Sequence, residues 1–173
     1  MNNEVLKAIL DRRSIRSYTD QPVEQEKLDA VLQAAINSPS ARNLQPWHFT
    51  VIQDKAMMDE LEEGVAKIAN DPSRKHIFYG APMIILVSAD SSSRWAKMDC
   101  GMATQNILLA AHSLGLGSCV IGFVMMYLGS PEAETTLKKL NLPEGYEPLY
   151  AITLGYPNVE PDARPREMKV SYL

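Results

Sequence analysis

The sequence predicts one layered α+β domain that spans residues 1–173. Helix patterns and strand patterns follow one another irregularly, without the regular strand–helix–strand order that a parallel α/β sheet requires. A length of 173 residues suits one domain with a buried core. A hydrophobic content of 46%, with 22% charged residues of both signs, is typical of a soluble globular protein.

The first half of the chain predicts three helices and one strand. Residues 3–12 carry an apolar stripe at helical spacing, and residues 24–37 repeat this pattern until Ser38-Pro39 ends it. Residues 48–53, "HFTVIQ", are rich in aromatic and β-branched side chains and predict a strand. Residues 55–69 again place apolar side chains on one face, which predicts the third helix.

The middle of the chain is expected to build the core. Residues 81–90, "APMIILVSAD", form a continuous apolar run, which predicts a strand buried on both faces. Residues 99–114 are helical and apolar nearly all round, as expected of a central core helix. Gly115 or Gly117 is expected to cap this helix, and a short strand then ends at Gly122.

Three more elements are expected toward the end of the chain. Ser130 and Pro131 suit the N-cap and first positions of a helix that runs to about Leu140. Residues 148–157, "PLYAITLGYP", predict a strand, and residues 168–173 alternate like an edge strand.

Composition and charge argue against several kinds of partner. The formal net charge of -4 disfavours nucleic acid. The N-terminus does not resemble a secretory signal, and the apolar region 102–124 holds too many polar residues and glycines for a membrane span. Cys100 and Cys119 form no paired motif and the three histidines are scattered, so we expect a cytoplasmic protein without a metal site.

Familiar catalytic motifs are missing from the sequence. Gly115-Leu116-Gly117 resembles the start of a dinucleotide-binding motif, but Val120 stands where its third glycine is required. The sequence contains no P-loop, no GxSxG nucleophile motif and no HExxH zinc motif. If the protein is an enzyme, an organic cofactor is therefore expected to carry the reaction.

A cluster of positive charge follows the first predicted helix. The stretch "DRRSIRSY", residues 11–18, holds three arginines within five positions. The helix dipole stabilises arginines at a helix end, which accounts for Arg12 and allows Arg13 but leaves Arg16 unexplained. Guanidiniums beside a serine hydroxyl also suit a phosphate group, which they bind bidentately. The stretch alone leaves a helix end and an anion site as open alternatives.

A second polar cluster lies in "NSPSARNLQPWHF", residues 37–49. A helix end, a turn and a core contact of Trp47 account for part of it. They do not account for Ser40, Asn43 and Gln45, three hydrogen-bonding side chains in a short connection. Asn and Gln amides offer both donors and acceptors, and the edge of an isoalloxazine ring presents matching groups.

Five segments in order, covering nearly the whole chain, resemble the FMN-dependent nitroreductase family. They are "RRSIRSY", "SPSARNLQPWHF", "QNILLAAHSLGLGSCVIGF", "LGYP" and "RPR". The resemblance implies a nitroreductase-like layered fold, with a central mixed or antiparallel sheet flanked by helices. It also implies an intertwined homodimer that binds FMN between its subunits.

The resemblance further implies which residues hold FMN. Those expected at the phosphate and ribityl chain are Arg12, Arg13, Ser14, Arg164 and Arg166. Those expected to reach the flavin from the other subunit are Pro39, Ser40, Asn43 and Gln45. Ile121 and Gly122 match the place where backbone N–H groups meet flavin N5 and O4. Arg16 matches the basic residue beside the pyrimidine edge, where a fixed cation stabilises the reduced flavin.

The activity that the resemblance implies is FMN-dependent oxidation of NADH or NADPH. Hydride passes to flavin N5 and then, in ping-pong fashion, to a nitroaromatic, a quinone or a similar small acceptor. The flavin carries this chemistry, so no side chain is expected to be catalytic. The alternatives are a related flavin enzyme, acting in reductive dehalogenation or oxygen-dependent flavin cleavage, and a non-catalytic FMN-binding or storage protein.

Overall fold

The computed structural model describes residues 3–173 and is built around a four-stranded sheet. The strands are β1 (Trp47–Ile52), β2 (Met83–Asp90), β3 (Gly117–Ile121) and β4 (Tyr146–Gly155). Their order across the sheet is β1-β2-β4-β3, and each neighbouring pair is antiparallel. The expected α+β fold with a central mixed or antiparallel sheet is therefore confirmed, and the sheet is antiparallel.

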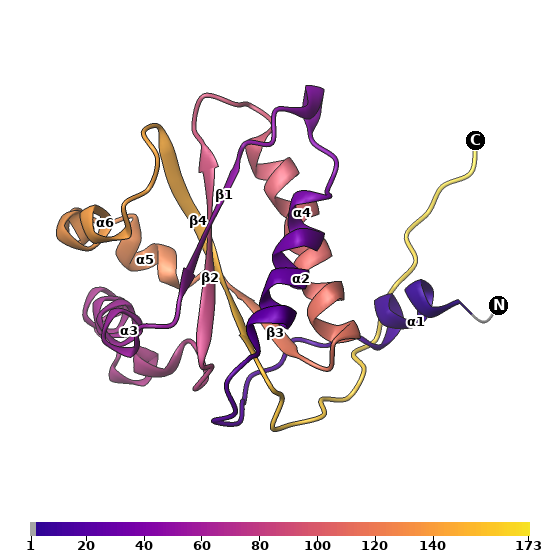
Figure 1. Ribbon diagram of the computed structural model, residues 1–173, viewed down its shortest axis with the longest axis horizontal. Coiled ribbons are helices and arrows are strands. Elements are labelled where there is room, and N and C mark those ends of the chain that lie inside the picture. The colour runs from indigo at the N-terminus through magenta and orange to yellow at the C-terminus, as the bar shows by residue number, and fades with distance from the viewer. Residues whose placement is uncertain (1–2) are drawn as a thin grey trace.

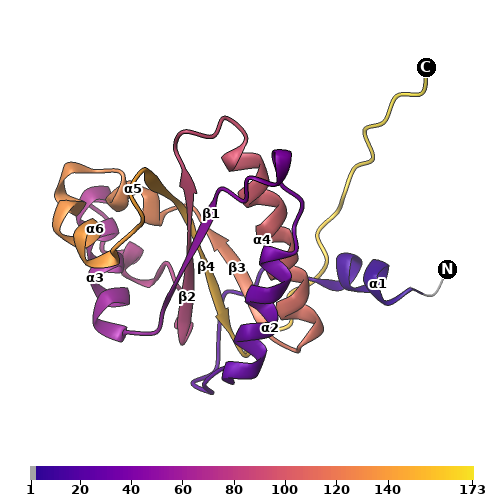
Figure 2. The same cartoon turned by 45° about the horizontal axis from the view of Figure 1, so that its top comes forward.

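Helices cover both faces of this sheet (Figures 1 and 2). The α-helices are α1 (Glu4–Asp11), α2 (Gln25–Ile36), α3 (Lys55–Ala69), α4 (Ala96–Ser113), α5 (Val124–Leu128) and α6 (Glu134–Leu140). The short 3₁₀ helices are η1 (Ala41–Asn43), η2 (Pro72–His76) and η3 (Pro131–Ala133). Helices α2 and α4 pack on one face and α3, α5 and α6 on the other, which makes three layers with the sheet in the middle.

Strand β2 lies in the centre of the core, as its continuous apolar run predicts. Residues 83–89 are all buried. Successive side chains of a strand point to opposite faces, so Ile85 and Val87 join the apolar cluster under α2 and α4. Ile84 and Leu86 join the cluster under α3 and α5. The two clusters stabilise the sheet from both sides.

Helix α4 is the central helix that the sequence predicts. Its side chains Cys100, Ala103 and Ile107 are 0% exposed. At its end the Leu116 N–H donates to a carbonyl of the last turn at 2.8 Å, and Gly115 adopts a φ of 76°. This left-handed conformation makes Gly115 the capping glycine.

Three elements differ from the sequence prediction. The helix predicted from Ser130 begins as the 3₁₀ helix η3 and becomes α-helical only at Glu134. The sequence did not predict α5, because five residues are too few to show a helical period. The edge strand predicted at residues 168–173 is wrong: these residues are exposed and have no regular structure, because a strand needs a neighbouring backbone to pair with.

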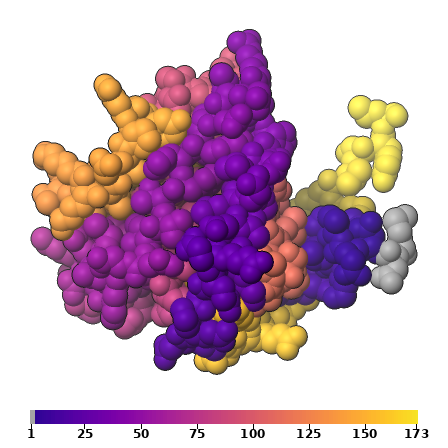
Figure 3. Space-filling view, in the orientation of Figure 1, coloured from indigo at the N-terminus to yellow at the C-terminus, as the bar shows by residue number. Residues whose placement is uncertain are grey.

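Helix α1 and the C-terminal segment, residues 159–173, leave the body on the same side (Figure 3). Helix α1 contributes no residue to the core. Its apolar stripe is exposed instead, with Val5 at 64% and Leu10 at 72% of full exposure. The C-terminal segment has no regular structure and is mostly exposed.

No helix within residues 3–173 is both long and apolar enough to cross a membrane. The same residues contain no group of three or more His, Cys, Asp or Glu side chains placed to hold a metal ion. The expected cytoplasmic location and the single domain over residues 1–173 stay predictions.

Candidate functional site

Residues 12–18, called the basic segment from here on, lie against the end of the sheet. Ser14 pairs in parallel with Ser118 of β3, and the Ile15 N–H donates to the Ser118 carbonyl at 3.0 Å. Tyr18 pairs antiparallel with Pro157, just beyond β4. The basic segment is therefore attached to the sheet at two points.

Tyr18 anchors the basic segment through its hydroxyl group. The side chain is buried, and its Oη lies 2.9 Å from the Ile15 carbonyl and 2.6 Å from Thr153 Oγ1 on β4. Burial raises the pKa of Tyr18, and the hydrogen bond with Thr153 only partly opposes this rise. The hydroxyl therefore stays neutral and keeps its hydrogen bonds across the physiological pH range.

The three arginines of the basic segment have different surroundings. Arg13 donates to the Leu10 carbonyl at 2.6 Å and to the Arg12 carbonyl at 3.0 Å, so it closes the C-terminal end of α1. Within residues 3–173, neither Arg12 nor Arg16 forms a hydrogen bond or an ion pair through its side chain. The helix-end alternative therefore fits Arg13, whereas Arg12 and Arg16 keep their donors for a ligand.

The charge of a second guanidinium, Arg166 of the C-terminal segment, acts on Arg12. Burial lowers the pKa of Arg12, and the charges of Arg166 and Arg13 lower it further. Like charges that act on one another are unfavourable unless an anion neutralises them. Arg12 also lines a hollow of about 830 Å³ beside Ser118. The guanidinium donors at this hollow fit a phosphate group.

A hollow of about 570 Å³, called the ring pocket from here on, opens at Arg16. Its lining is Arg16, Ser73, Arg74, His76, Ile77, Tyr79, residues 119–123 and Met126. The ring pocket brings together Arg16, Ile121 and Gly122, which the sequence predicts at the flavin ring. A Cβ atom on Gly122 would meet nothing within 4 Å, so the backbone there is open to a ligand.

Cys119 lies between these two regions of the site. Burial raises the pKa of its thiol, and the nearby Arg16, Ser14 and Arg12 partly oppose the rise. A protonated, buried thiol is a poor nucleophile. Cys119 therefore lines the site as a structural residue and is not expected to act as a nucleophile.

The loop of residues 37–45 has an unusual backbone conformation. Arg42, Asn43 and Gln45 have positive φ angles of 54°, 57° and 50°, although none is glycine. Each such residue costs about 1 kcal/mol or more, which surrounding contacts must offset. Two contacts do so within the loop: the Gln45 N–H donates to Ser40 Oγ at 3.0 Å, and Gln45 Nε2 donates to Asn43 Oδ1 at 3.1 Å.

A buried carboxylate fixes this loop to α4. Asp99, in the first turn of α4, is 0% exposed, and its two oxygens lie 3.3 and 3.2 Å from the Ala41 nitrogen, which donates to them. The N-terminal end of a helix stabilises a negative charge. Asp99 therefore positions loop 37–45, a role that the sequence analysis missed although a charge inside an apolar helix pattern signals it.

Loop 37–45 and the basic segment lie at opposite ends of α4. Asp99 holds the loop at the N-terminal end of this helix, and Ser118 holds the basic segment just after the C-terminal end. The 18 residues of α4 span about 27 Å. Figure 1 shows the α2–β1 connection at one end of the molecule and the chain after α1 toward the other. Within one chain, the residues that stay remote from Arg12 and Arg16 are Pro39, Ser40, Asn43 and Gln45.

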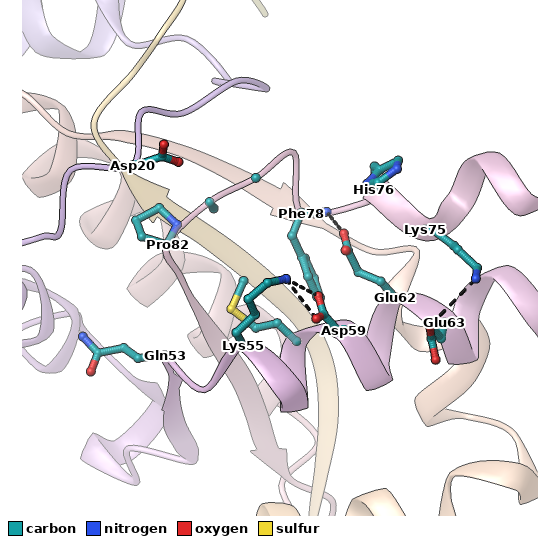
Figure 4. A pocket seen from close by; sticks show the side chains of 13 residues that line it. Asp20, Gln53, Lys55, Asp59, Glu62, Glu63, Lys75, His76, Phe78 and Pro82 are labelled. Carbon is teal, nitrogen blue, oxygen red and sulfur yellow. Dashed lines mark hydrogen bonds and ion pairs between the residues drawn. The ribbon is translucent and has the colours of Figure 1, made fainter.

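Another hollow, of about 550 Å³, lies beside α3 and is drawn in Figure 4. Four of its charged side chains pair with one another, and a fifth accepts a hydrogen bond from the backbone. Lys55 pairs with Asp59 at 2.9 Å, and Lys75 pairs with Glu63 at 3.8 Å. Glu62 accepts a hydrogen bond from a backbone N–H at 2.7 Å, and burial raises its pKa. We therefore place the candidate site at the basic segment and the ring pocket instead.

Close packing under the basic segment gives a testable prediction at Gly117. A Cβ atom at this position would lie only 2.7–2.9 Å from side-chain atoms of Ile15. Gly117→Ala is therefore expected to lower the free energy of unfolding by about 1–3 kcal/mol, the usual cost of overpacking. Urea denaturation followed by circular dichroism measures the change.

Gly101→Ala is the matched control for this substitution. A Cβ atom on Gly101, within α4, would meet nothing within 4 Å. Because alanine favours a helix over glycine by about 1 kcal/mol, this variant is expected to be as stable as the wild type or more so. Equal stability of the two variants would contradict the close contact at Gly117.

The sequence of the chain is similar to those of known proteins. The model of the nitroreductase family matches residues 9–156. A protein of Methanothermobacter thermautotrophicus, provisionally named NADH dehydrogenase/NAD(P)H nitroreductase, is 39% identical over 168 residues, which cover 93% of this chain and 81% of that protein. An FMN reductase of Bacillus subtilis that uses NAD(P)H is 32% identical and is matched over 95% of this chain and 70% of its own length.

Solved structures resemble the whole chain. A nitroreductase with bound FMN from Desulfitobacterium hafniense superimposes with a TM-score of 0.90 at 36% identity and covers 100% of both chains. A nitroreductase with bound FMN from Bacteroides fragilis has a TM-score of 0.85 at 31% identity and covers 99% of this chain and 98% of that one.

Proposed function

The chain belongs to the nitroreductase family, and from this premise we infer that it is an FMN-dependent oxidoreductase with NADH or NADPH as its electron donor. The structural observation that carries the inference is the pair Arg12 and Arg16, whose guanidiniums have no anionic partner within residues 3–173. In a chain with a net charge of -4, two such groups at the rim of two hollows favour an anionic ligand.

The residues of the candidate site divide between the two parts of FMN. Arg12, Ser14, Arg164 and Arg166 are assigned to the phosphate end of the cofactor, beside Arg13, whose guanidinium closes the end of α1. Arg16 is assigned to the pyrimidine edge of the ring, with the backbone of Ile121 and Gly122 along the ring. When bound, FMN supplies the two-electron chemistry between the nicotinamide and a small acceptor such as a nitroaromatic or a quinone. The chain itself binds the phosphate, orients the ring and holds a positive charge beside it.

We further propose a homodimer in which loop 37–45 of one chain completes the flavin site of its partner. Asp99 holds the loop of Gln45 near the N-terminal end of α4, and Ser118 holds the segment of Arg16 just after its C-terminal end. The residues from Asp99 to Ser113 span about 21 Å, so one ring is not expected to contact Arg16 and Gln45 of the same chain. The exposed apolar stripe of α1 and the unpaired C-terminal segment offer surface to a second copy. An apolar surface of this kind on a well-packed chain is typical of a protein–protein interface.

The experiment that tests the function is acceptor-dependent turnover of the purified holoprotein. Flavin released by denaturation is identified by chromatography, and oxidation of NADH and of NADPH is followed anaerobically with and without a quinone. FMN as the released flavin, with pyridine nucleotide oxidation that requires the acceptor, is the expected result. Bound FMN without turnover would favour a storage protein, and FAD or no flavin would contradict the cofactor assignment.

A further inference from the structure

The ring pocket has an unusual charge composition. Its lining contains two guanidiniums, Arg16 and Arg74, and the imidazole of His76, but no carboxylate. The hollow of Figure 4 is lined by four carboxylates, those of Asp20, Asp59, Glu62 and Glu63, together with the basic side chains of Lys55, Lys75 and His76. In a chain with more acidic than basic residues, the ring pocket is therefore selectively positive.

Arg74 is held in place while its outer donors remain free. Its guanidinium carbon lies 4.2 Å from the centre of the Phe123 ring, a stacked cation–π arrangement. Its Nε lies 3.3 Å from Asp71 Oδ2, and the other carboxylate oxygen, Asp71 Oδ1, accepts from the Ser73 N–H at 3.0 Å. Within residues 3–173, the two terminal amino groups of Arg74 donate no hydrogen bond. Stacking and ion pairing therefore fix the plane of the guanidinium and leave one edge for a ligand.

The lining of the ring pocket also includes exposed apolar side chains. Phe123 and Met126 are 46% and 40% exposed, although both line the hollow. An exposed ring and a polarisable thioether favour contact with a flat aromatic molecule. The pocket thus combines an aromatic surface with a fixed cation at its edge.

We propose that the ring pocket admits a flat aromatic electron acceptor that carries an anionic substituent, and that Arg74 binds that substituent. This inference rests on the proposed function, which assigns Arg16 to the flavin edge and so leaves Arg74 as the cation available to the acceptor. A guanidinium binds a carboxylate through two parallel charge-assisted hydrogen bonds. Arg74 therefore sets acceptor specificity, while the flavin sets reactivity.

The test compares two acceptors of similar size and shape, the anion 4-nitrobenzoate and its neutral analogue 4-nitrobenzamide. Their dissociation constants for the oxidised, FMN-loaded protein are measured by calorimetry, and their kcat/KM values are measured with NADH or NADPH. We expect the wild type to prefer the carboxylate by about 10-fold or more, as one charge-assisted hydrogen bond allows. Arg74→Gln is expected to abolish the preference while the affinity for the amide changes less than about twofold.

Two further variants make the test specific. Arg74→Lys keeps the charge without the planar fork and is expected to retain part of the preference. Arg94→Gln is the matched control, because Arg94 stacks on Trp95 at 4.4 Å but does not line the ring pocket. Its binding of both acceptors is expected to equal that of the wild type.

The outcomes separate this inference from the proposed function. If the wild type holds no FMN or reduces neither acceptor, the proposed function fails and the inference fails with it. If both acceptors are reduced but the wild type and Arg74→Gln show the same preference, only the role of Arg74 is overturned. Loss of FMN in Arg74→Gln would assign the residue to the cofactor, and a defect confined to NADH and NADPH would assign it to the donor's phosphates. Either result would overturn the inference.

Discussion

Replacing Arg12 by alanine is expected to weaken FMN binding by about 10- to 150-fold, because one charge-assisted hydrogen bond contributes about 1.5–3 kcal/mol. Arg12 is half-buried, the charge of Arg166 acts on it, and it has no anionic partner within residues 3–173. Its guanidinium is therefore ready for a phosphate without first breaking another contact. Fluorescence titration of the apoprotein with FMN measures the loss.

A separate unfolding measurement distinguishes this role from a helix-end role. If Arg12 only stabilised the end of α1, Arg12→Ala would lower the free energy of unfolding by about 0.3–1 kcal/mol and leave the affinity for FMN unchanged. That result would mean that Arg12 stabilises the end of α1 and does not bind FMN.

Substitution of Arg16 is expected to act differently from substitution of Arg12, because Arg16 lines the ring pocket and not the hollow beside Arg12. A positive charge beside the ring favours the more negatively charged redox state of the cofactor. Arg16→Gln is expected to lower the flavin midpoint potential by about 20 mV, which corresponds to about 1 kcal/mol for two electrons. The effect on FMN affinity should be smaller than that of Arg12→Ala. An unchanged potential with strongly weakened binding would move Arg16 to the phosphate end.

The second large effect is expected in mixed dimers of two defective chains. One chain carries Arg12→Ala, and the other carries Asn43→Ala together with Gln45→Ala. If loop 37–45 serves the partner's flavin, each homodimer has a defect in both of its sites. In a mixed dimer, the site that contains the Arg12→Ala substitution also receives the substituted loop, so one site carries all the substitutions. The other site combines an unchanged Arg12 with an unchanged loop and stays intact. Random pairing should then restore about a quarter of all sites.

Different affinity tags on the two chains allow the mixed dimers to be isolated and their FMN content measured. About one FMN per mixed dimer is the expected result, against little or none in either homodimer. Absence of recovery would mean that each site is built within one chain, and a monomer that keeps its full FMN content would exclude the shared site directly.

Much of the fold was predictable because the decisive patterns are local. The helix predicted at residues 55–69 is α3, Lys55–Ala69, because its apolar side chains recur with the helical period. The apolar run of β2 is likewise a local property that only a fully buried strand explains. The wrong edge strand at residues 168–173 shows the limit of such patterns, since alternation predicts a strand only where another backbone pairs with it.

The candidate site also has a part that local sequence patterns show and a part that only the folded chain shows. The excess charge of Arg12 and Arg16 is visible in the sequence, because three arginines in five positions need an explanation. The residues that hold the site together are not visible there. Tyr18 meets its partner Thr153 across 135 positions of the chain, and Asp99 meets its partner across 58. Such contacts depend on the order of the strands and on the placement of α4, which no local pattern encodes.

The left-handed residues of loop 37–45 affect the entropy cost and the selectivity of ligand binding. Glycine at Arg42, Asn43 or Gln45 would relieve strain, but it would also let the unliganded loop sample many conformations. The strained side chains and the buried carboxylate of Asp99 hold the loop in one shape before any ligand arrives. Ligand binding then requires no ordering of the loop, so little conformational entropy is lost on association. A preformed surface of this kind also discriminates by shape, because it cannot adapt to a poorly fitting molecule.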